Sequence, residues 1–284
     1  MAERPSVILT IAGFDPSSGA GVTADIKTIA AHGCYGVACI TAMTVQSTAG
    51  VRRVEEVDPA LVNDTLEELA SDIPIAAVHI GMLGTAKAVR AVAEFLGRRS
   101  GKAKLPNVVL DPILRSSSGS DLLDAAGTKV LIEKMIPLAD VITPNVDEAC
   151  VLTGLKKITD LDEMRAAAAK LHQMGSVAAV ITGGHLEKAT DLLSFTTKQG
   201  TQQEIFKAER QRSNSTHGTG CAFATAIACH LALDRGLAEA TLLAKTYVTA
   251  AIAAGHPLGR GTGPVHHLYR MNQQRRGASS GSES

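Results

Sequence analysis

Short apolar runs rich in β-branched residues recur along the chain, separated by longer stretches rich in Ala, Leu, Glu and Lys. The runs that predict strands are Val7–Ala12, Val37–Ala42, Ala76–Ile80, Val108–Leu110, Val141–Thr143 and Val177–Thr182. The stretches that predict helices are Ala24–Ala31, Pro59–Ala70, Ala86–Leu96, Ala125–Ile136, Leu161–Met174, Ala222–Leu233 and Ala238–Ala254. Gly33, Gly97 and Gly175 each follow a predicted helix, where a C-terminal capping glycine is common.

This alternation predicts the fold class. Apolar runs without interspersed polar residues indicate strands that are covered on both faces. Strands that alternate with helices favour right-handed crossovers and a parallel sheet. We therefore expect one α/β domain over residues 1–270, with a mostly parallel central sheet and helices on both faces. The small, polar segment 271–284 is expected to be a disordered tail.

The composition argues against several classes of partner. Lys+Arg and Asp+Glu both number 28, and aromatic residues make up only 3 % of the chain. Proteins that bind nucleic acid or anionic lipid usually carry a basic excess, so we expect neither partner. No apolar run reaches the roughly 18 residues of a membrane span. The five cysteines include no C-x-x-C pair, which argues against a zinc site or a redox motif. Their odd number and the absence of a secretory signal favour a reducing cytoplasm.

The first glycine loop, residues 13–21, follows the first predicted strand. Within it, Gly19 to Ala24 fits the dinucleotide-binding pattern G-x-G-x-x-A. That pattern requires an acidic residue at the end of the next strand, where the sequence is Ile40-Thr41-Ala42-Met43. We therefore do not favour NAD binding. Glycines also let a loop fold close over a small ligand.

The second glycine loop, residues 213–221, opens the predicted helix Ala222–Leu233. The bare N–H groups and the positive end of a helix dipole favour an anion such as phosphate. The alternative is an ordinary helix start that is capped by Ser or Thr. Cys221 stands in the first turn, where a helix lowers a thiol pKa, so it is a candidate base or nucleophile. The other four cysteines are expected to be small buried hydrophobic residues.

Eight ordered motifs extend over residues 7–267. They are Leu9-Thr-Ile-Ala-Gly13-Phe-Asp15-Pro-Ser, Gly19-Ala-Gly21-Val-Thr-Ala-Asp25-Ile-Lys-Thr, Ile80-Gly-Met82-Leu, Val109-Leu-Asp111-Pro, Ile142-Thr-Pro-Asn145-Val-Asp-Glu148-Ala, Gly183-Gly-His185, Thr216-His-Gly-Thr-Gly-Cys221 and Gly263-Pro-Val-His-His267. With these motifs the chain resembles the hydroxymethylpyrimidine and phosphomethylpyrimidine kinases of thiamine biosynthesis. The resemblance implies a single three-layer ribokinase-like domain. It also implies ATP and Mg²⁺ as cofactors, a small pyrimidine alcohol as substrate and a homodimer.

The resemblance also implies which residues bind the pyrimidine. These are Gly13, Asp25, Gln46 and Met82. The amide of Gln46 offers both a donor and an acceptor, which matches an aminopyrimidine edge. Without the family context, Gln46 would be an ordinary loop residue, and Asp25 a charge in the first turn of a helix.

By the same resemblance, Asp111 and Glu148 hold the metal. The residues implied at the nucleotide are Asn145, Thr182, Thr216 and Lys245. Carboxylates and water are ligands that suit Mg²⁺. Glu148 also stands where a helix-capping residue occurs, and both roles are compatible.

The catalytic residues that the resemblance implies are Gly218, Gly220 and Cys221. The two glycines would receive the migrating phosphoryl group, and Cys221 would take the hydroxyl proton. ATP would phosphorylate first the hydroxymethyl oxygen and then the phosphate of the monophosphate.

The chain departs from the family pattern at two places. Thr182 replaces a lysine that reaches the ATP phosphates, a charge that Lys245 or a nearby Arg would have to supply. Arg115 is either such a charge or a solvated loop residue. A pyridoxal kinase is the first alternative function, although such relatives carry a cysteine where this chain has Ser116. A non-catalytic ligand-binding homologue is the second.

Overall fold

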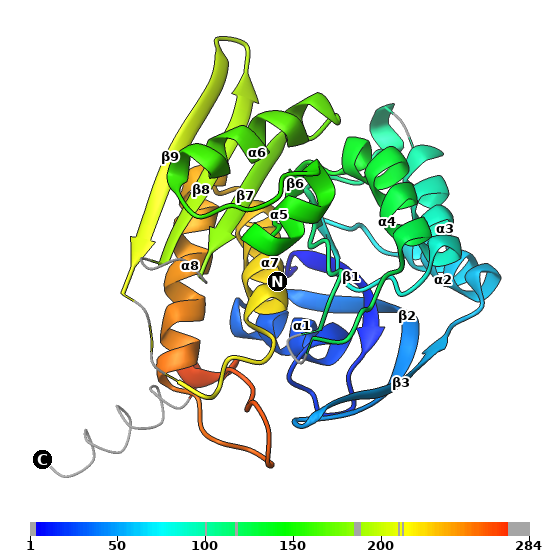
Figure 1. Ribbon diagram of the computed structural model, residues 1–284. Coiled ribbons are helices and arrows are strands. Elements are labelled where there is room, and N and C mark those ends of the chain that lie inside the picture. The colour runs from blue at the N-terminus through cyan, green and yellow to red at the C-terminus, as the bar shows by residue number, and fades with distance from the viewer. Residues whose placement is uncertain are drawn as a thin grey trace, which may run out of the picture.

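A central sheet runs through the molecule (Figure 1). The computed structural model describes residues 4–99, 101–116, 119–184, 189–209, 211 and 213–271. In this part of the chain the strand order is β3-β2-β1-β4-β5-β6-β7-β8-β9. The strands are β1 (Val7–Phe14), β2 (Tyr35–Ser47), β3 (Gly50–Glu56), β4 (Ala77–Ile80), β5 (Val108–Leu110), β6 (Val141–Ile142), β7 (Ala178–Gly183), β8 (Ala189–Thr197) and β9 (Gly200–Ala208).

The middle of the sheet is parallel and both ends are antiparallel. Strands β2, β1, β4, β5, β6 and β7 pair in parallel. Strand β3 pairs antiparallel with β2. At the other end, β8 pairs antiparallel with β7, and β9 pairs antiparallel with β8. The mostly parallel sheet is thus confirmed, whereas the three antiparallel strands were not predicted from the sequence.

Helices cover both faces of the sheet. On one face lie α2 (Pro59–Asp72), α3 (Ala86–Gly97), α4 (Ala125–Val130), α5 (Val146–Thr153) and α6 (Leu161–Gln173). On the other lie α1 (Gly21–Ala31), α7 (Thr219–Ala232) and α8 (Leu237–Ala253). Successive strand residues alternate between two buried clusters: in β1, Leu9 and Ile11 pack under the first group of helices and Ile8 under the second. This arrangement confirms the predicted three layers.

Two helix predictions need correction. Gly33 and Gly175 end their helices with left-handed φ angles of 74° and 103°, as predicted. Gly97, however, is the last residue of α3 and takes no such conformation. The predicted helix 125–136 also divides after Val130 into a π turn (Leu131–Met135) and a 3-10 turn (Ile136–Leu138), since Pro137 cannot continue a helix.

The parallel topology places the loops that carry the motifs at one edge of the sheet. The segments after β1, β4, β5 and β6 all leave the carboxyl ends of parallel strands, the edge at which α/β proteins bind ligands. Within the described residues, none of the helices has the length and apolar composition that crossing a bilayer requires. The predicted tail beyond residue 271 and His185 of the sixth motif lie outside the described residues.

Candidate active site

Helix α7 begins at the second glycine loop without a side-chain cap. Gly218 is its N-cap, in a left-handed conformation with φ 82°, and no side chain caps the first turn. A Cβ on residue 218 would clash with the Gly19 carbonyl oxygen, so only glycine fits there. The alternative of a helix start capped by Ser or Thr is therefore wrong. The first turn presents backbone N–H groups and a positive dipole end to an anion.

The first glycine loop closes back on itself and on the second loop. Gly21 has φ 61°, and a Cβ there would clash with the Gly13 carbonyl oxygen. A Cβ on Gly19 would clash with the ring of His217. Asp15 holds the turn, because its Oδ1 accepts from the Ser17 backbone at 2.8 Å. The two loops form one compact surface, although they come from opposite ends of the chain.

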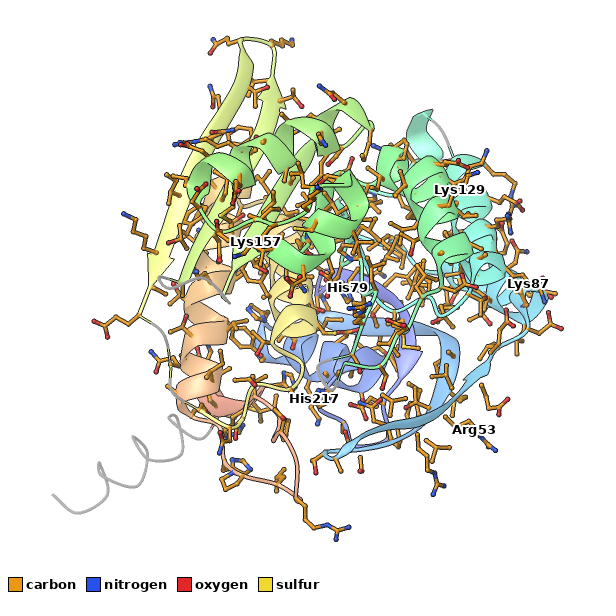
Figure 2. All side chains as sticks on the ribbon, viewed as in Figure 1. Arg53, His79, Lys87, Lys129, Lys157 and His217 are labelled. Atoms are coloured by element: carbon orange, nitrogen blue, oxygen red, sulfur yellow. The ribbon has the colours of Figure 1, made fainter. Side chains whose placement is uncertain are left out.

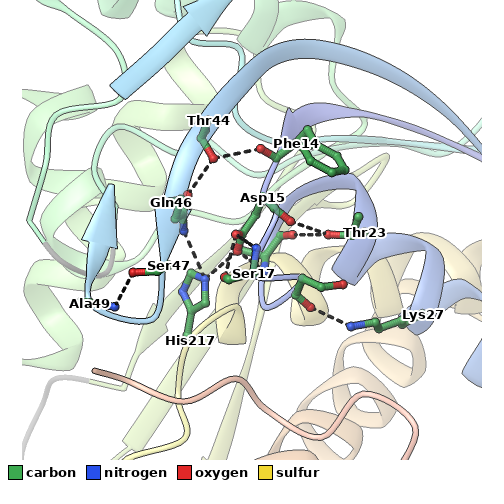
Figure 3. A network of polar contacts seen from close by, with 12 residues as sticks. Phe14, Asp15, Ser17, Thr23, Lys27, Thr44, Gln46, Ser47, Ala49 and His217 are labelled. Carbon is green, nitrogen blue, oxygen red and sulfur yellow. Dashed lines mark hydrogen bonds and ion pairs between the residues drawn. The ribbon is translucent and has the colours of Figure 1, made fainter. Parts of the chain in front are cut away.

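Asp15 and His217 connect these loops to Gln46 (Figure 3). His217 Nε2 lies 2.8 Å from Asp15 Oδ2 and 3.3 Å from Gln46 Nε2. Burial alone would raise the pKa of Asp15, but hydrogen bonds from His217 and Ser17 outweigh burial and lower it. Asp15 and His217 belong to two of the motifs but were not predicted as site residues. A histidine between Thr216 and Gly218 in an anion loop was the available signal.

The predicted ring-binding residues converge from three segments. A Cβ on Gly13 would lie 2.9 Å from Met82 Sδ, so β1 and the loop after β4 are in contact there. Thr41 of β2 donates a hydrogen bond of 2.6 Å to the Met82 carbonyl oxygen. Gln46 lies further along the same strand, at its end. The structure thus brings Gly13 and Met82 together and places Gln46 on the neighbouring strand.

Asp25 lies in a buried polar network. Its Oδ1 accepts from Thr225 Oγ1 at 3.0 Å and its Oδ2 from Thr10 Oγ1 at 2.6 Å. The fully buried His79 places Nδ1 3.3 Å from the same Oδ2 (Figure 2). The alternative of a charge in the first turn of α1 is wrong, because that turn contains no acidic residue. Protein partners hold both oxygens of Asp25, and its contact with the pyrimidine stays a prediction.

Asp111 and Glu148 form a buried carboxylate pair. Burial and then the repulsion by Glu148 and Asp25 raise the pKa of Asp111 well above its usual value. Burial also raises the pKa of Glu148 to about 7. Asp111 Oδ2 has no hydrogen-bond partner among the described residues and would lie 3.6 Å from a Cβ on Gly220. The carboxylate of Asp111 therefore faces the first turn of α7.

These two carboxylates fit a magnesium ion. An orphaned buried oxygen beside a second carboxylate lacks a counter-charge, which a divalent cation would supply. Mg²⁺ keeps several of its waters and needs only one or two protein carboxylates. The described residues contain no cluster of three or more His, Cys, Asp or Glu side chains that could hold a metal. Glu148 also completes a capping box with Asn145, as expected, so both of its predicted roles are compatible.

Cys221 is buried beside these carboxylates. Burial, followed by the charges of Asp111 and Asp25, raises the pKa of its thiol well above the usual value. The predicted lowering of this pKa by the helix end is therefore wrong. A hydrogen bond from the Gly21 backbone acts in the lowering direction but is outweighed.

Of the predicted nucleotide residues, Asn145 follows β6, Thr182 lies near the end of β7 and Lys245 lies on α8. The Thr182 backbone donates to the Pro144 carbonyl at 2.9 Å, which places Thr182 beside Asn145. Thr182 of β7 is paired in the sheet with Asp191 of β8, and Asp191 Oδ2 accepts a hydrogen bond from Lys245 Nζ at 2.6 Å. Asp191 thus holds the ammonium of Lys245 at the strand that neighbours Thr182.

Two further predicted groups lie in exposed loops. Thr216 is exposed, and its carbonyl oxygen accepts from Thr219 Oγ1 at 2.7 Å. Arg115 is paired with Asp121 at 2.7 Å, and about seven tenths of each side chain is exposed (71 % and 73 %). This pairing favours the interpretation of Arg115 as a solvated loop residue.

The site geometry agrees with the matches to known proteins. The model of the phosphomethylpyrimidine kinase family matches residues 15–266. The chain belongs to this family. Most of the described chain falls inside the matched region, including the second glycine loop, residues 15–21 of the first and the carboxylate pair.

Several curated relatives cover most of this chain. The hydroxymethylpyrimidine/phosphomethylpyrimidine kinase of Streptomyces coelicolor is 39 % identical over 95 % of this chain and 97 % of its own. The thiamine biosynthesis bifunctional protein ThiED of Geobacter sulfurreducens is 43 % identical over 94 % of this chain. The chain spans about half of that longer protein, 53 % of its length.

Solved structures of two kinds resemble this fold. The pyridoxal kinase of Bacillus subtilis, in an ADP complex, matches with a TM-score of 0.84 and 33 % identity over 94 % of this chain and 100 % of its own. The phosphomethylpyrimidine kinase of Clostridium difficile matches with a TM-score of 0.76 and 37 % identity over 87 % of this chain and 99 % of its own. Fold similarity alone therefore does not distinguish the two substrates.

Proposed function

We propose that this protein is a kinase that transfers the γ-phosphoryl group of ATP, with Mg²⁺, to 4-amino-5-hydroxymethyl-2-methylpyrimidine and then to its monophosphate. The family membership supports the reaction class, and the names of the relatives support the substrate. The observation that carries the proposal is the orphaned carboxylate oxygen of Asp111, which faces the uncapped first turn of α7. A phosphoryl group and its cation need an anion site and a carboxylate side by side.

The residues of the chain divide the work between two ends of the site. At the phosphate end, backbone N–H groups from Gly218 to Cys221 hold the migrating phosphoryl group. Cys221 would take the proton of the acceptor hydroxyl only as the thiolate. A cation held by Asp111 and Glu148 would favour that form by offsetting the carboxylate charges that, together with burial, raise the pKa of the thiol. When bound between Asp111 and Glu148, Mg²⁺ supplies positive charge that neutralises the phosphate oxygens. Catalysis then rests on positioning and on charge stabilisation, without a covalent enzyme intermediate.

At the other end, the pyrimidine lies against Gly13 and Met82 with its polar edge on Gln46. The apolar sulfur of Met82 and the open backbone of Gly13 suit a flat ring. At the nucleotide, Lys245 would supply the charge that Thr182 lacks, at the cost of its ion pair with Asp191.

A pyridoxal kinase is the second candidate function, because the B. subtilis pyridoxal kinase shares this fold at 33 % identity. Ser116 counts against it, since the family resemblance places a cysteine there in pyridoxal kinases. Three curated relatives that are 39–40 % identical over 92–95 % of this chain carry the pyrimidine kinase name.

Phosphorus NMR tests the proposed function. The protein is incubated with the pyrimidine alcohol, ATP and Mg²⁺, and we expect a phosphomonoester signal, then diphosphate signals, together with ADP. Intact ATP despite calorimetrically measured binding would indicate a non-catalytic homologue. A kcat/KM for pyridoxal above that for the pyrimidine would establish the second candidate instead. A homodimer, a cytoplasmic location and a nucleotide contact at Thr216 stay predictions.

A further inference from the structure

Two polar side chains contact the amide of Gln46 (Figure 3). Its nitrogen lies 3.3 Å from His217 Nε2, and its oxygen lies 3.2 Å from Thr44 Oγ1. His217 Nε2 is also 2.8 Å from Asp15 Oδ2, and Thr44 Oγ1 is 3.0 Å from the Phe14 carbonyl oxygen. Each of the two neighbours of Gln46 is therefore shared with a second partner that can only accept.

This sharing decides which way the amide must face. His217 Nε2 can bond the carboxylate of Asp15 only by donating its proton, and it then cannot accept from the amide nitrogen. Thr44 has a single hydroxyl proton, which the Phe14 carbonyl oxygen takes at the shorter distance. A half-turn of the amide resolves both conflicts, because its oxygen then accepts from His217 and its nitrogen donates to Thr44.

The carboxylate of Asp15 holds the proton on His217 Nε2. Asp15 is 3 % exposed, and its Oδ2 also accepts from the Ala20 backbone at 3.0 Å, so this oxygen faces two donors. These bonds favour the ionised carboxylate, which accepts only. The ring of His217 cannot move toward Gly19, since even a Cβ there would clash with it. Position and protonation of the Nε2 atom are both set by the two glycine loops.

We propose that His217, with its Nε2 proton fixed by Asp15, is a positioning residue that sets the orientation of the Gln46 amide. The amide orientation in turn selects substrate rings by which ring atom donates and which accepts a hydrogen bond. This inference rests on the proposed function. The amide keeps one oxygen lone pair and one N–H group for the ligand. They match the exocyclic amine and the neighbouring ring nitrogen of a 4-aminopyrimidine.

The chemical consequence concerns the direction of the reacting group. An amide facing the other way would bind the same ring only after the ring had turned over. That turn would carry the 5-hydroxymethyl group to the opposite side of the contact, away from its place in the productive complex. A 4-oxo analogue, whose ring N–H donates and whose carbonyl accepts, fits only the reversed amide. His217 would therefore discriminate between these two rings without touching either.

The kinetic test compares kcat/KM for the 4-amino alcohol and its 4-oxo analogue in the wild type and in His217→Leu. We expect the preference for the amine to fall about tenfold or more, because a freed amide serves both rings. His217→Gln keeps an N–H donor near Asp15 and should restore part of the preference. Damage to the fold would lower both rates alike, so an unchanged ratio in His217→Leu overturns the inference.

Ser17→Ala is the matched control. It removes the Ser17 hydroxyl bond to Asp15 Oδ1 and leaves the Oδ2 that contacts His217. The amine preference should stay at the wild-type value. If it falls as far as in His217→Leu, general loosening of the loop explains the effect and the inference is wrong.

A second measurement does not depend on turnover. Nitrogen-15 NMR of histidine-labelled protein, with His217 assigned from the His217→Gln variant, reports which ring nitrogens carry protons. We expect a protonated Nε2 at pH 7. An unprotonated Nε2 overturns the inference whatever the substrate is. If Nε2 is protonated but the pyrimidine is not phosphorylated, the proposed function fails while the Asp15–His217 arrangement stands.

Discussion

Cys221 lies in the first turn of α7, where a helix end favours the thiolate, yet burial and the charges of Asp111, Asp25 and Glu148 reverse the direction of its pKa shift. The helix position can be read from the sequence. The burial and the nearby charges cannot, because the fold brings these carboxylates to Cys221 from other elements. The helix-end rule therefore placed Cys221 correctly in the first turn but predicted the wrong direction for the pKa shift of its thiol.

Replacing Cys221 by Ala tests its role as the base. We expect kcat to fall by about 10²–10⁴-fold, the usual contribution of a positioned base, with ATP affinity by calorimetry nearly unchanged. Cys229→Ala, eight residues along the same helix and equally buried, is the control and should keep wild-type kcat. Wild-type turnover in Cys221→Ala would remove Cys221 from the mechanism.

The predicted and the unpredicted site residues differ in how their function can be recognised. The glycines of the second loop indicate an anion site from the sequence alone, and Asp111 and Glu148 are assigned through the family resemblance of their motifs. The role of Asp191 becomes visible only through its ion pair with Lys245, which lies on a helix far away in the sequence. Nothing in the sequence near either residue indicates their pairing.

At the scale of elements, burial separates the predicted strands β1 and β4 from the missed strands β3 and β9, whereas the missed strand β8 is buried in its middle. Strands β1 and β4 are buried along almost their whole length and show as continuous apolar runs. Strands β3 and β9 are exposed at nearly every position, with sequences GVRRVEE and GTQQEIFKA. Only their neighbours in the sheet hold them as strands, so hydrophobic pattern could not reveal them.

The start of α7 yields a prediction about a helix terminus. Gly218→Ala places a side chain in a left-handed conformation and against the Gly19 carbonyl oxygen. We expect a loss of about 1–3 kcal/mol in the free energy of unfolding and a raised KM for ATP. Thermal denaturation and steady-state kinetics measure both.

Gly236→Ala is the matched control for this change. Gly236 is the N-cap of α8, with φ −63° and open space around its Cβ position. The N-cap preference for Gly over Ala is opposed by the smaller unfolded-state entropy of Ala, so the Gly236→Ala variant should lose less than about 1 kcal/mol in the free energy of unfolding. Equal effects of the two substitutions would show that the loop contact at residue 218 carries no strain.

At the scale of the whole molecule, the layer formed by α1, α7 and α8 contains the buried His230 beside the half-buried His32. The rings of His32 and His230 lie 4.9 Å apart, edge to face. Burial, followed by the charges of His32, Arg270 and Arg235, lowers the pKa of His230 to about 4. An unfolded histidine titrates near 6.5. Between these values the unfolded chain binds protons that the folded protein does not.

The contribution of His230 to stability should consequently be lost on acidification. This contribution to the free energy of unfolding falls as the pH drops from about 6.5 towards 4, because protons bind His230 in the unfolded chain. The raised pKa of Glu148 acts in the opposite direction, so the comparison of variants isolates the part due to His230. Urea denaturation at a series of pH values measures this fall. His230→Gln should flatten it, whereas His256→Gln, at an exposed position, should not. A pH profile that is unchanged in His230→Gln would show that this histidine is not responsible.

The contact between Gly19 and Gly218 packs the first glycine loop directly against the second, so the two loops form one rigid unit. No methyl group fits between the backbones, so neither loop can move toward the other, and a ligand that displaces one must displace both. Phosphoryl transfer requires the acceptor oxygen and the phosphorus atom to stay in line within a fraction of an ångström. Because the two loops are in direct contact, they would keep that alignment while the pyrimidine and ATP bind from different directions.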